Sequence, residues 1–207
     1  RRLIHIKQLG LANWVFPGAE HTRYIHSLGV MHIIDQMAIK LHYDDKERQI
    51  VRLAALLHDL GHYPLSHVGE AAYQSNTLKQ EDSIILQCKN NTKEKIDALH
   101  NSENFNWDYM QVANNPYHHE RITTLVIKHD PDIKRMIKEC NCDEFIKIDD
   151  ICAIITGDVE EKDYLSDKVQ LLHSELDADR IDYLMRDATF SGTTYGGFEL
   201  GLLFDNL

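Results

Sequence analysis

The sequence predicts an all-α protein, a helical bundle built around one core within its 207 residues. Apolar residues recur every three or four positions in most segments, which is the spacing of a helix with one buried face. Residues that favour helix starts and ends, such as Asp, Pro and Gly, flank several of these segments. Almost nothing alternates with the period of two that strands show, so we allow for one short hairpin at most.

The first elements are a short structured segment, a loop and a long helix. Ile4 to Leu11 is expected to form a short helix or turn that ends near Gly10. A loop from Asn13 to Gly18 follows, closed by a Pro-Gly pair. Thr22 then provides a fair N-cap for a helix with an inward apolar stripe. The stripe comprises Ile25, Leu28, Ile33, Met37 and Leu41.

The next helix has a clear start and a clear stop. Asp44 precedes Glu47 by three residues, which is the capping-box pattern. We expect Gly61 to close this helix as a C-cap in the left-handed conformation, and Pro64 to prevent its continuation. A short helix from Ser66 to Tyr73 should follow.

A polar segment from Ser75 to Asn115 interrupts the helical pattern, and we interpret it as an insertion with room for the hairpin. Helical spacing returns from His119 to Lys128. Four further helices are expected. One starts at Pro131, one runs from Asp149 or Asp150 to Gly157, and one covers Leu165 to Leu172. The last covers Asp177 to Arg186, with Leu176, Ile181 and Leu184 facing inward. We expect one domain over residues 1–207, and the abrupt ends predict that it is a fragment of a longer chain.

The composition argues against a nucleic-acid-binding, a membrane or a disulfide-rich protein. The formal net charge of −11 argues against a broad nucleic-acid surface, so phosphates would have to be bound locally. No apolar run reaches membrane-spanning length, and no signal peptide opens the sequence. Four cysteines form no dense disulfide pattern. We therefore expect a cytoplasmic protein, or a nuclear one in a eukaryote, with no membrane partner.

The most unusual stretch places His58 and Asp59 side by side at the end of an apolar helix. An unpaired buried carboxylate costs several kcal/mol, and a divalent metal would offset that cost. In isolation the pair is better explained as a helix-end His beside a capping Asp. His26 and one acid of the helix after Leu176 change this balance. Together they supply two imidazoles and two carboxylates, which suit one divalent Mg, Mn, Fe or Zn ion.

The helix after Leu176 carries a heavy ionic load. Its charged side chains are Asp177, Asp179, Arg180, Asp182, Arg186 and Asp187. Spacing alone favours a solvated face with ion pairs between successive turns.

This arrangement of His, His-Asp and Asp on separate helices resembles the HD superfamily of metal-dependent phosphohydrolases. Several blocks are similar to its deoxynucleoside triphosphate triphosphohydrolase branch, which includes bacterial enzymes and the animal enzyme with a sterile-alpha-motif domain. The blocks are Ile6–Gly10, Val15–Ala19, Arg23–Val30, His58–His62 with Pro64, Ser66 and His67, and Leu176–Asp187. They cover most of the chain outside the polar insertion.

The resemblance implies a metal-ligand set and a reaction centre. The ligands would be His26, His58, Asp59 and Asp179, the last chosen over Asp177 because the ligand of the family precedes a basic residue. Besides Asp59, three histidines would contact phosphate and move protons, namely His62, His67 and His119.

The resemblance also implies substrate contacts. Arg23 would contact the α-phosphate, and Arg180 and Tyr183 the triphosphate. Gln8 and Asp187 match positions that contact the sugar, and Leu9 matches one that crowds a 2′-hydroxyl. Ile25 occupies a position that is often acidic in relatives, which would weaken the support of His26. His21 either lines the mouth of the pocket or begins the helix.

The implied reaction is cleavage of deoxynucleoside triphosphates to a deoxynucleoside and inorganic triphosphate. The implied partners are these nucleotides, an activating nucleotide and further copies of the full-length chain. One alternative is another HD phosphohydrolase, either a nucleoside monophosphatase or a cyclic nucleotide phosphodiesterase. Another is a non-catalytic nucleotide sensor or nucleic-acid-binding scaffold.

Overall fold

The computed structural model describes residues 1–73, 118–140, 145–159 and 162–207. Within these ranges every regular element is a helix, and the only β-type pairing is one isolated bridge between Lys7 and Thr22. The prediction of an all-α bundle is therefore confirmed. The predicted insertion and its hairpin lie outside the described residues. No helix in the described ranges has the length and apolar character needed to cross a membrane.

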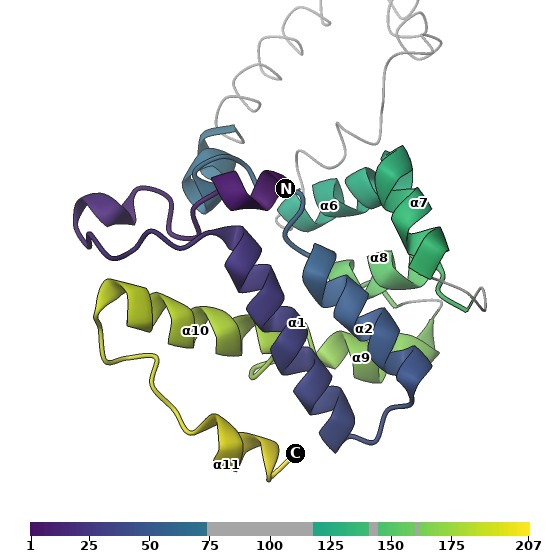
Figure 1. Cartoon of the computed structure of the whole chain (residues 1–207). Helices are drawn as coiled ribbons and strands as arrows, with labels where there is room; N and C mark the ends of the chain where they lie inside the picture. The colour runs from purple at the N-terminus through teal and green to yellow at the C-terminus, as the bar shows by residue number, and fades with distance from the viewer. Residues whose placement is uncertain (74–117, 141–144, 160–161) are drawn as a thin grey trace, which may run out of the picture.

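Two antiparallel helices form the centre of the bundle, α1 (Arg23–Lys40) and α2 (Asp45–Leu57) (Figure 1). The predicted capping box is present, because the Asp44 carboxylate accepts from Lys46 N and Glu47 N, and Glu47 accepts from Asp44 N. Thr22 occupies the predicted N-cap of α1, although its side chain makes no capping hydrogen bond. Leu41, predicted to face inward, is 39% exposed just beyond the end of α1.

The turn after α2 differs from the prediction. Gly61 does not have a positive φ, whereas Leu65 (φ 68°) and Ser66 (φ 55°) do. Gly61 is needed for another reason: a Cβ there would stand 2.0 Å from His119 O and 2.5 Å from Thr123 N. Glycine thus allows the backbone of α6 (His118–His129) to approach the end of α2. Residues 66–73 are helical, as expected.

The following helices cover the α2 side of the bundle. α7 (Pro131–Cys140) starts at the predicted proline, and α8 (Ile148–Thr156) ends at Gly157, which has a φ of 71°. The N-cap of α8 is Lys147, so the prediction that Asp149 or Asp150 caps it is wrong; both lie in its first turn. Instead of one helix over 165–172, a 3-10 turn (Asp163–Leu165) leads into the short α9 (Ser166–Gln170).

The acidic helix, α10 (Ala178–Ser191), is longer than predicted and has Asp177 as its N-cap. Ile181 is buried, but Leu176 and Leu184 are 45% and 38% exposed, so their predicted inward orientation is wrong. Asp177 and Asp182 are buried instead, so the face is not the solvated one that spacing favoured. The reason is that α10 meets polar groups of α1 on this side.

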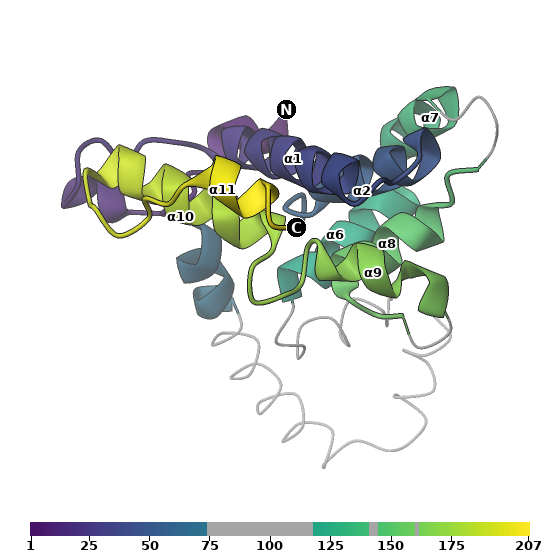
Figure 2. The same cartoon turned by 90° about the horizontal axis from the view of Figure 1, so that it is seen from below.

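The helices meet in a way that gathers their polar ends. α10 packs against α1, while α8 packs against both α2 and α6 (Figures 1 and 2). A short final helix, α11 (Leu200–Phe204), touches α1 (Figure 2). The apolar core runs through α1, α2, α6 and α8. The start of α1, the end of α2, the start of α6 and the start of α10 converge on one region.

Candidate functional site

Three helices bring the four predicted metal ligands together. His26 lies in the first turn of α1, His58 and Asp59 follow α2, and Asp179 lies in the first turn of α10. Asp179 Oδ1 is 2.8 Å from His26 Nε2 and 3.6 Å from His58 Nε2. Asp59 lies 3.3 Å from His58 Nε2 and 3.8 Å from His26 Nε2. Donor atoms of His26, His58 and Asp179 therefore lie within 4.8 Å of one another, and Asp59 lies beside them in contact with both imidazoles.

The outer nitrogen of each imidazole fixes its orientation. His26 Nδ1 lies 2.7 Å from Asp182 Oδ2, and His58 Nδ1 lies 2.7 Å from Ala55 O. Both oxygens accept, so each Nδ1–H donates outward and each Nε2 faces the carboxylates. His58 Nε2 is buried and has no hydrogen-bond partner among the described residues. A buried imidazole nitrogen turned toward carboxylates is the arrangement that a divalent metal satisfies, so these residues fit one.

The electrostatics of the set favour a positive charge. Burial lowers the pKa of His26, but the carboxylates of Asp179, Asp182 and Asp59 outweigh burial and raise it to about 9. Burial raises the pKa of Asp179, but the close contact with His26 and the charge of the nearby His58 outweigh it and hold that pKa far below its usual range. The same attraction that retains a proton here would retain a metal ion.

Asp182 supports His26 and was missed from the sequence. It is 5% exposed, and Arg186 holds it through two hydrogen bonds of 2.8 Å and 2.7 Å. Gly29 makes room for this pair, since a Cβ there would stand 1.8 Å from Asp182 Oδ1. The available signal was spacing: Asp182 is three residues after Asp179 on one helix and four before Arg186. Support for His26 thus comes from α10 and not from position 25.

A cavity of about 320 Å³ lies beside the ligand set. Most of the predicted site residues line it: Gln8, Leu9, Arg23, Asp59, His62, His67, His119, Asp179, Tyr183 and Asp187, together with Glu120. His26 and His58 do not line it. Arg180 lines an adjoining cavity of about 530 Å³ that shares His119, Glu120 and Asp179 with the first. Its guanidinium lies 3.1 Å from Glu175 O.

Arg23 is a buried cation in the wall of the smaller cavity. Its Nη1 donates to Asp59 Oδ2 at 2.8 Å, and its Nε donates to Ser66 Oγ at 2.9 Å. Ser66 Oγ in turn donates to Lys7 O at 2.7 Å. The left-handed backbone at Leu65 and Ser66 costs roughly 1–3 kcal/mol per residue and places Ser66 against the guanidinium.

His62, His67 and His119, which the sequence predicted as site residues, form a second group with Glu70. Glu70 was not predicted. The rings of His62 and His119 stack with centroids 3.9 Å apart, and His67 meets His62 edge-on at 4.9 Å. Glu70 Oε2 is 3.3 Å from His67 Nδ1, and Glu70 Oε1 is 3.4 Å from His119 Nδ1. Glu70 comes one helical turn after His67, which is the signal that sequence offered.

Burial sets the protonation of two neighbouring groups. It lowers the pKa of His62 to about 2, so this imidazole stays neutral and offers an N–H or a lone pair. It raises the pKa of Glu120 to about 7, which leaves that carboxyl near the point of half-protonation at neutral pH. Glu120 Oε2 is buried without a hydrogen-bond partner among the described residues.

Asp187 is held from behind by His21. A ring nitrogen of His21 lies 2.7 Å from Asp187 Oδ1, and the ring packs against Phe190 with centroids 4.6 Å apart. His21 is 2% exposed and precedes α1, so it positions a wall residue and does not line the cavity mouth.

Comparison with known proteins decides the family. The model of the HD domain matches residues 23–187. The chain belongs to the HD domain family. The matched range begins at Arg23 and ends at Asp187, so it contains every ligand of the first group and the whole second group.

Similar proteins place this HD domain within longer chains. It is 33% identical over 198 residues to the MG461 homolog of Mycoplasma pneumoniae, covering 94% of this chain and 38% of that protein. It is 29% identical over 201 residues to the deoxynucleoside triphosphate triphosphohydrolase SAMHD1 homolog of Dictyostelium discoideum. This match covers 93% of this chain and 32% of that protein. The solved structure of a phosphohydrolase from Bacteroides thetaiotaomicron matches with a TM-score of 0.60 at 27% identity. The match covers 98% of this chain and 38% of that one. The family and these neighbours support a phosphohydrolase.

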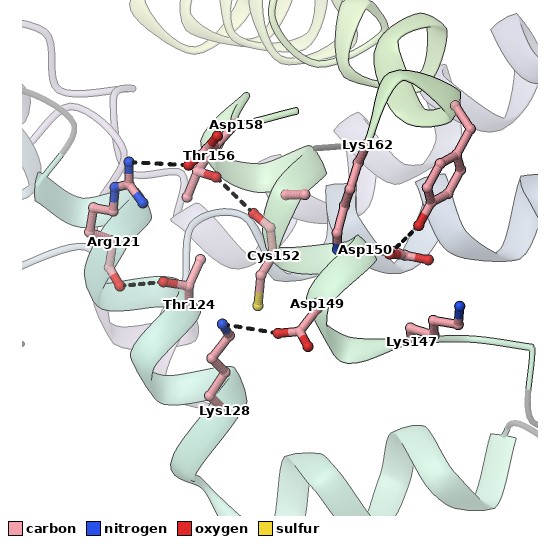
Figure 3. Close-up of a pocket in the computed structure, with 12 residues that line it drawn as sticks. Arg121, Thr124, Lys128, Lys147, Asp149, Asp150, Cys152, Thr156, Asp158 and Lys162 are labelled. Carbon is pink, nitrogen blue, oxygen red and sulfur yellow. Dashed lines mark hydrogen bonds and ion pairs between the residues drawn. The ribbon is translucent and has the colours of Figure 1, made fainter. Parts of the chain in front are cut away.

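Another hollow of the HD domain, about 630 Å³, lies between α6 and α8 and holds none of the predicted site residues (Figure 3). Its charges pair across the gap: Lys128 Nζ lies 3.0 Å from Asp149, and Lys162 Nζ lies 2.9 Å from Asp150. Arg121 faces Asp158 at 3.9 Å. Because acids neutralise most of its cations, this hollow has no group left over that points to a particular ligand.

Proposed function

We propose that this chain is the catalytic HD domain of a metal-dependent enzyme that cleaves deoxynucleoside triphosphates to a deoxynucleoside and inorganic triphosphate. The observation that carries the proposal is the position of Arg23, Tyr183, Asp187 and Gln8 around one cavity beside the ligand set. The relative from Dictyostelium, named as such an enzyme, supports the choice of substrate class.

His26, His58, Asp59 and Asp179 would hold one divalent ion, of Mg, Mn, Fe or Zn. When bound, such an ion lowers the pKa of a coordinated water and polarises a phosphoryl oxygen. The protein residues around it define where the substrate lies. Arg23 is fixed through Asp59 and Ser66, so its charge stays in the cavity wall without a search of rotamers.

Arg23 and Arg180 supply the positive charge that the acidic chain lacks overall. A guanidinium donates several hydrogen bonds in one plane and suits phosphate oxygens. Arg180 lines the adjoining cavity, and its guanidinium contacts Glu175. It would leave Glu175 and turn toward a bound triphosphate. Tyr183 follows Arg180 by one turn on α10 and lines the 320 Å³ cavity.

The leaving 5′-oxygen needs a proton, which His67 and His119 would provide. Glu70 holds one nitrogen of each ring, which orients both imidazoles toward the cavity that they line. Burial raises the pKa of Glu70, but the hydrogen bonds from His119 and His67 outweigh it and keep the carboxyl ionised. His62 stays neutral and would contact a phosphate oxygen through an N–H group.

The sugar would lie against Gln8, Leu9 and Asp187. Gln8 is 8% exposed, and its Oε1 has no hydrogen-bond partner among the described residues. A buried amide oxygen without a partner favours a ligand hydroxyl that can donate to it. Leu9 adds an apolar surface on the same wall, where an additional 2′-hydroxyl would lose its hydration.

We further propose one domain over residues 1–207, assembly of the full-length protein into a homo-oligomer, an activating nucleotide, and a cytoplasmic location, or a nuclear one in a eukaryote. The resemblance described above supports the oligomer and the activator. The net charge of −11 argues against nucleic acid as a partner.

Product analysis tests the function. The metal-loaded full-length protein is incubated with each deoxynucleoside triphosphate, singly and mixed, beside the variants Asp179→Ala and Asp132→Ala. Asp132 is an exposed carboxylate of α7 and serves as the matched control. Deoxynucleoside with intact triphosphate, lost only in Asp179→Ala, supports the proposal, and turnover only in mixtures adds the activator. Orthophosphate from monophosphates supports another HD phosphohydrolase, and binding without turnover supports a sensor.

A further inference from the structure

The second group offers a complete set of metal donors that is separate from the first. One ring nitrogen from each of His62, His67 and His119 and one oxygen of Glu70 all lie within 4.8 Å of one another. The first group, by contrast, combines two histidines with carboxylates. Three imidazoles and one carboxylate form a donor set that favours zinc and its neighbours among the transition metals over magnesium.

The geometry is close to what a tetrahedral ion requires. Ligand atoms about 2.0–2.1 Å from zinc stand roughly 3.3 Å from one another. Glu70 already lies 3.3 Å from His67 Nδ1 and 3.4 Å from His119 Nδ1, although through its two different oxygens. The side chain of His67 is 70% exposed, so it can rotate to close the remaining gap without disturbing the core.

An independent observation concerns the buried member of the group. His62 is 1% exposed, and its Nδ1 has no hydrogen-bond partner among the described residues. A buried ring nitrogen without a partner is costly, and a metal ion bound by Nδ1 itself would offset that cost. The three histidines also line the 320 Å³ cavity, so an ion can reach them from solvent.

We infer that His62, His67, Glu70 and His119 form a second, zinc-type metal site, and that zinc bound there switches off hydrolysis at the neighbouring centre. The inhibition rests on the proposed function, because the ion would hold the histidines that contact phosphate and supply the proton. The binding itself does not depend on that function. The deoxynucleoside triphosphate substrate and zinc would then compete for one wall of the cavity.

The test measures zinc stoichiometry and the visible absorption of bound Co²⁺ in the full-length protein. Asp179→Ala removes a ligand of the first site and isolates the second. His67→Ala is added to it, since His67 is exposed and its loss should not unfold the protein. His129→Ala, an exposed histidine on the same helix as His119, is the matched control. Circular dichroism confirms that each variant is folded.

We expect Asp179→Ala to retain one zinc ion per chain and the intense absorption of tetrahedral Co²⁺. Both should be lost when His67→Ala is added, and both should persist when His129→Ala is added. Absence of zinc from Asp179→Ala, or zinc that survives His67→Ala, would overturn the inference. If zinc binds as expected but no nucleotide is hydrolysed under any condition, the proposed function and the inhibition fail while the site stands. If nucleotide is hydrolysed but zinc binds only once, the proposed function stands, and the second site and its inhibition both fail.

Discussion

Replacement of Gly61 by alanine should push apart the two segments that carry His58, Asp59 and His119. The added Cβ would stand 2.0 Å from His119 O, whereas ordinary contact begins near 3.4 Å, so the two segments must separate by about 1.4 Å. The atoms in the way are backbone atoms of α6, which cannot rotate aside. The separation would also stretch two hydrogen bonds, from Gly61 N to Thr123 Oγ1 at 2.7 Å and from Thr123 Oγ1 to His58 O at 2.8 Å.

The expected loss of stability follows from these terms. Overpacking costs about 1–3 kcal/mol, and each weakened hydrogen bond about 0.5–1.5 kcal/mol. We therefore expect Gly61→Ala to lower the free energy of unfolding by about 2–6 kcal/mol. For a domain of this size that corresponds to a fall in Tm of roughly 4–24 °C. Metal affinity should fall as well, because His58 and Asp59 belong to the displaced turn.

Differential scanning calorimetry of the full-length protein measures the effect, with Gly201→Ala as control. Gly201 lies in α11, and a Cβ there would meet nothing within 4 Å, so its Tm should stay unchanged or rise slightly. A Gly61→Ala protein that melts within 1–2 °C of wild type, about the scale of a 0.5 kcal/mol change, would refute the close-approach argument.

Three further predictions concern the ligand set, a buried carboxyl and a helix cap. Asp182→Asn should weaken metal binding about 10–100-fold while leaving the ligands in place, because the hydrogen bond that orients His26 is weakened; competition with a chelator measures it, and unchanged affinity would contradict it. Glu120→Gln should stabilise the metal-free protein at pH 8 but not at pH 4. In wild type the folded state retains the Glu120 proton from the ordinary pKa of 4.5 up to about 7, so stability falls as pH rises through that window. The pKa difference of about 2.5 sets a ceiling of about 3 kcal/mol, reduced by partial exposure; chemical denaturation at several pH values measures it, and parallel pH profiles for the two proteins would count against it. Asp44→Ala should cost about 0.5–2 kcal/mol through loss of the capping box; thermal melts beside Asp45→Ala as control check it, and equal Tm values would show that the cap contributes nothing.

Local signals predicted the helices because their causes are local. The Asp44 cap, the Pro131 start and the Gly157 stop depend on residues within one turn of each other. The pairing of His58 with Asp59 is a local signal as well, but it indicated a metal only together with His26 and an acid of the helix after Leu176.

The errors at Gly61 and on the inward face of α10 have a common cause, which is contact between distant segments. Gly61 is required by α6, some sixty residues later, and not by its own backbone angle. The inward face of α10 carries Asp182 because it meets His26 of α1, so the apolar spacing of Leu176 and Leu184 misled. Sequence spacing contains no record of which helix will lie opposite.

The choice between Asp177 and Asp179 also depended on information beyond spacing. Asp177 is occupied as the N-cap of α10, where its carboxylate accepts from Arg180 N at 2.7 Å and from Ser174 N at 3.1 Å. That role turns it toward its own backbone, while Asp179 reaches His26 and His58. Both positions carry the same residue type, so composition could not separate them.

The origin of the four ligands on helices far apart in sequence makes a bound ion a cross-link. It would tie residue 26 to residues 58–59 and these to residue 179, and so close one short loop and one long loop of the chain. The entropy cost of closing a loop grows only with the logarithm of its length, so doubling the long loop costs only about 0.6 kcal/mol. The polar segment from residue 75 to 115 lies inside that long loop. Its length can therefore change greatly during evolution or engineering with little penalty to the metal centre that the loop helps to close.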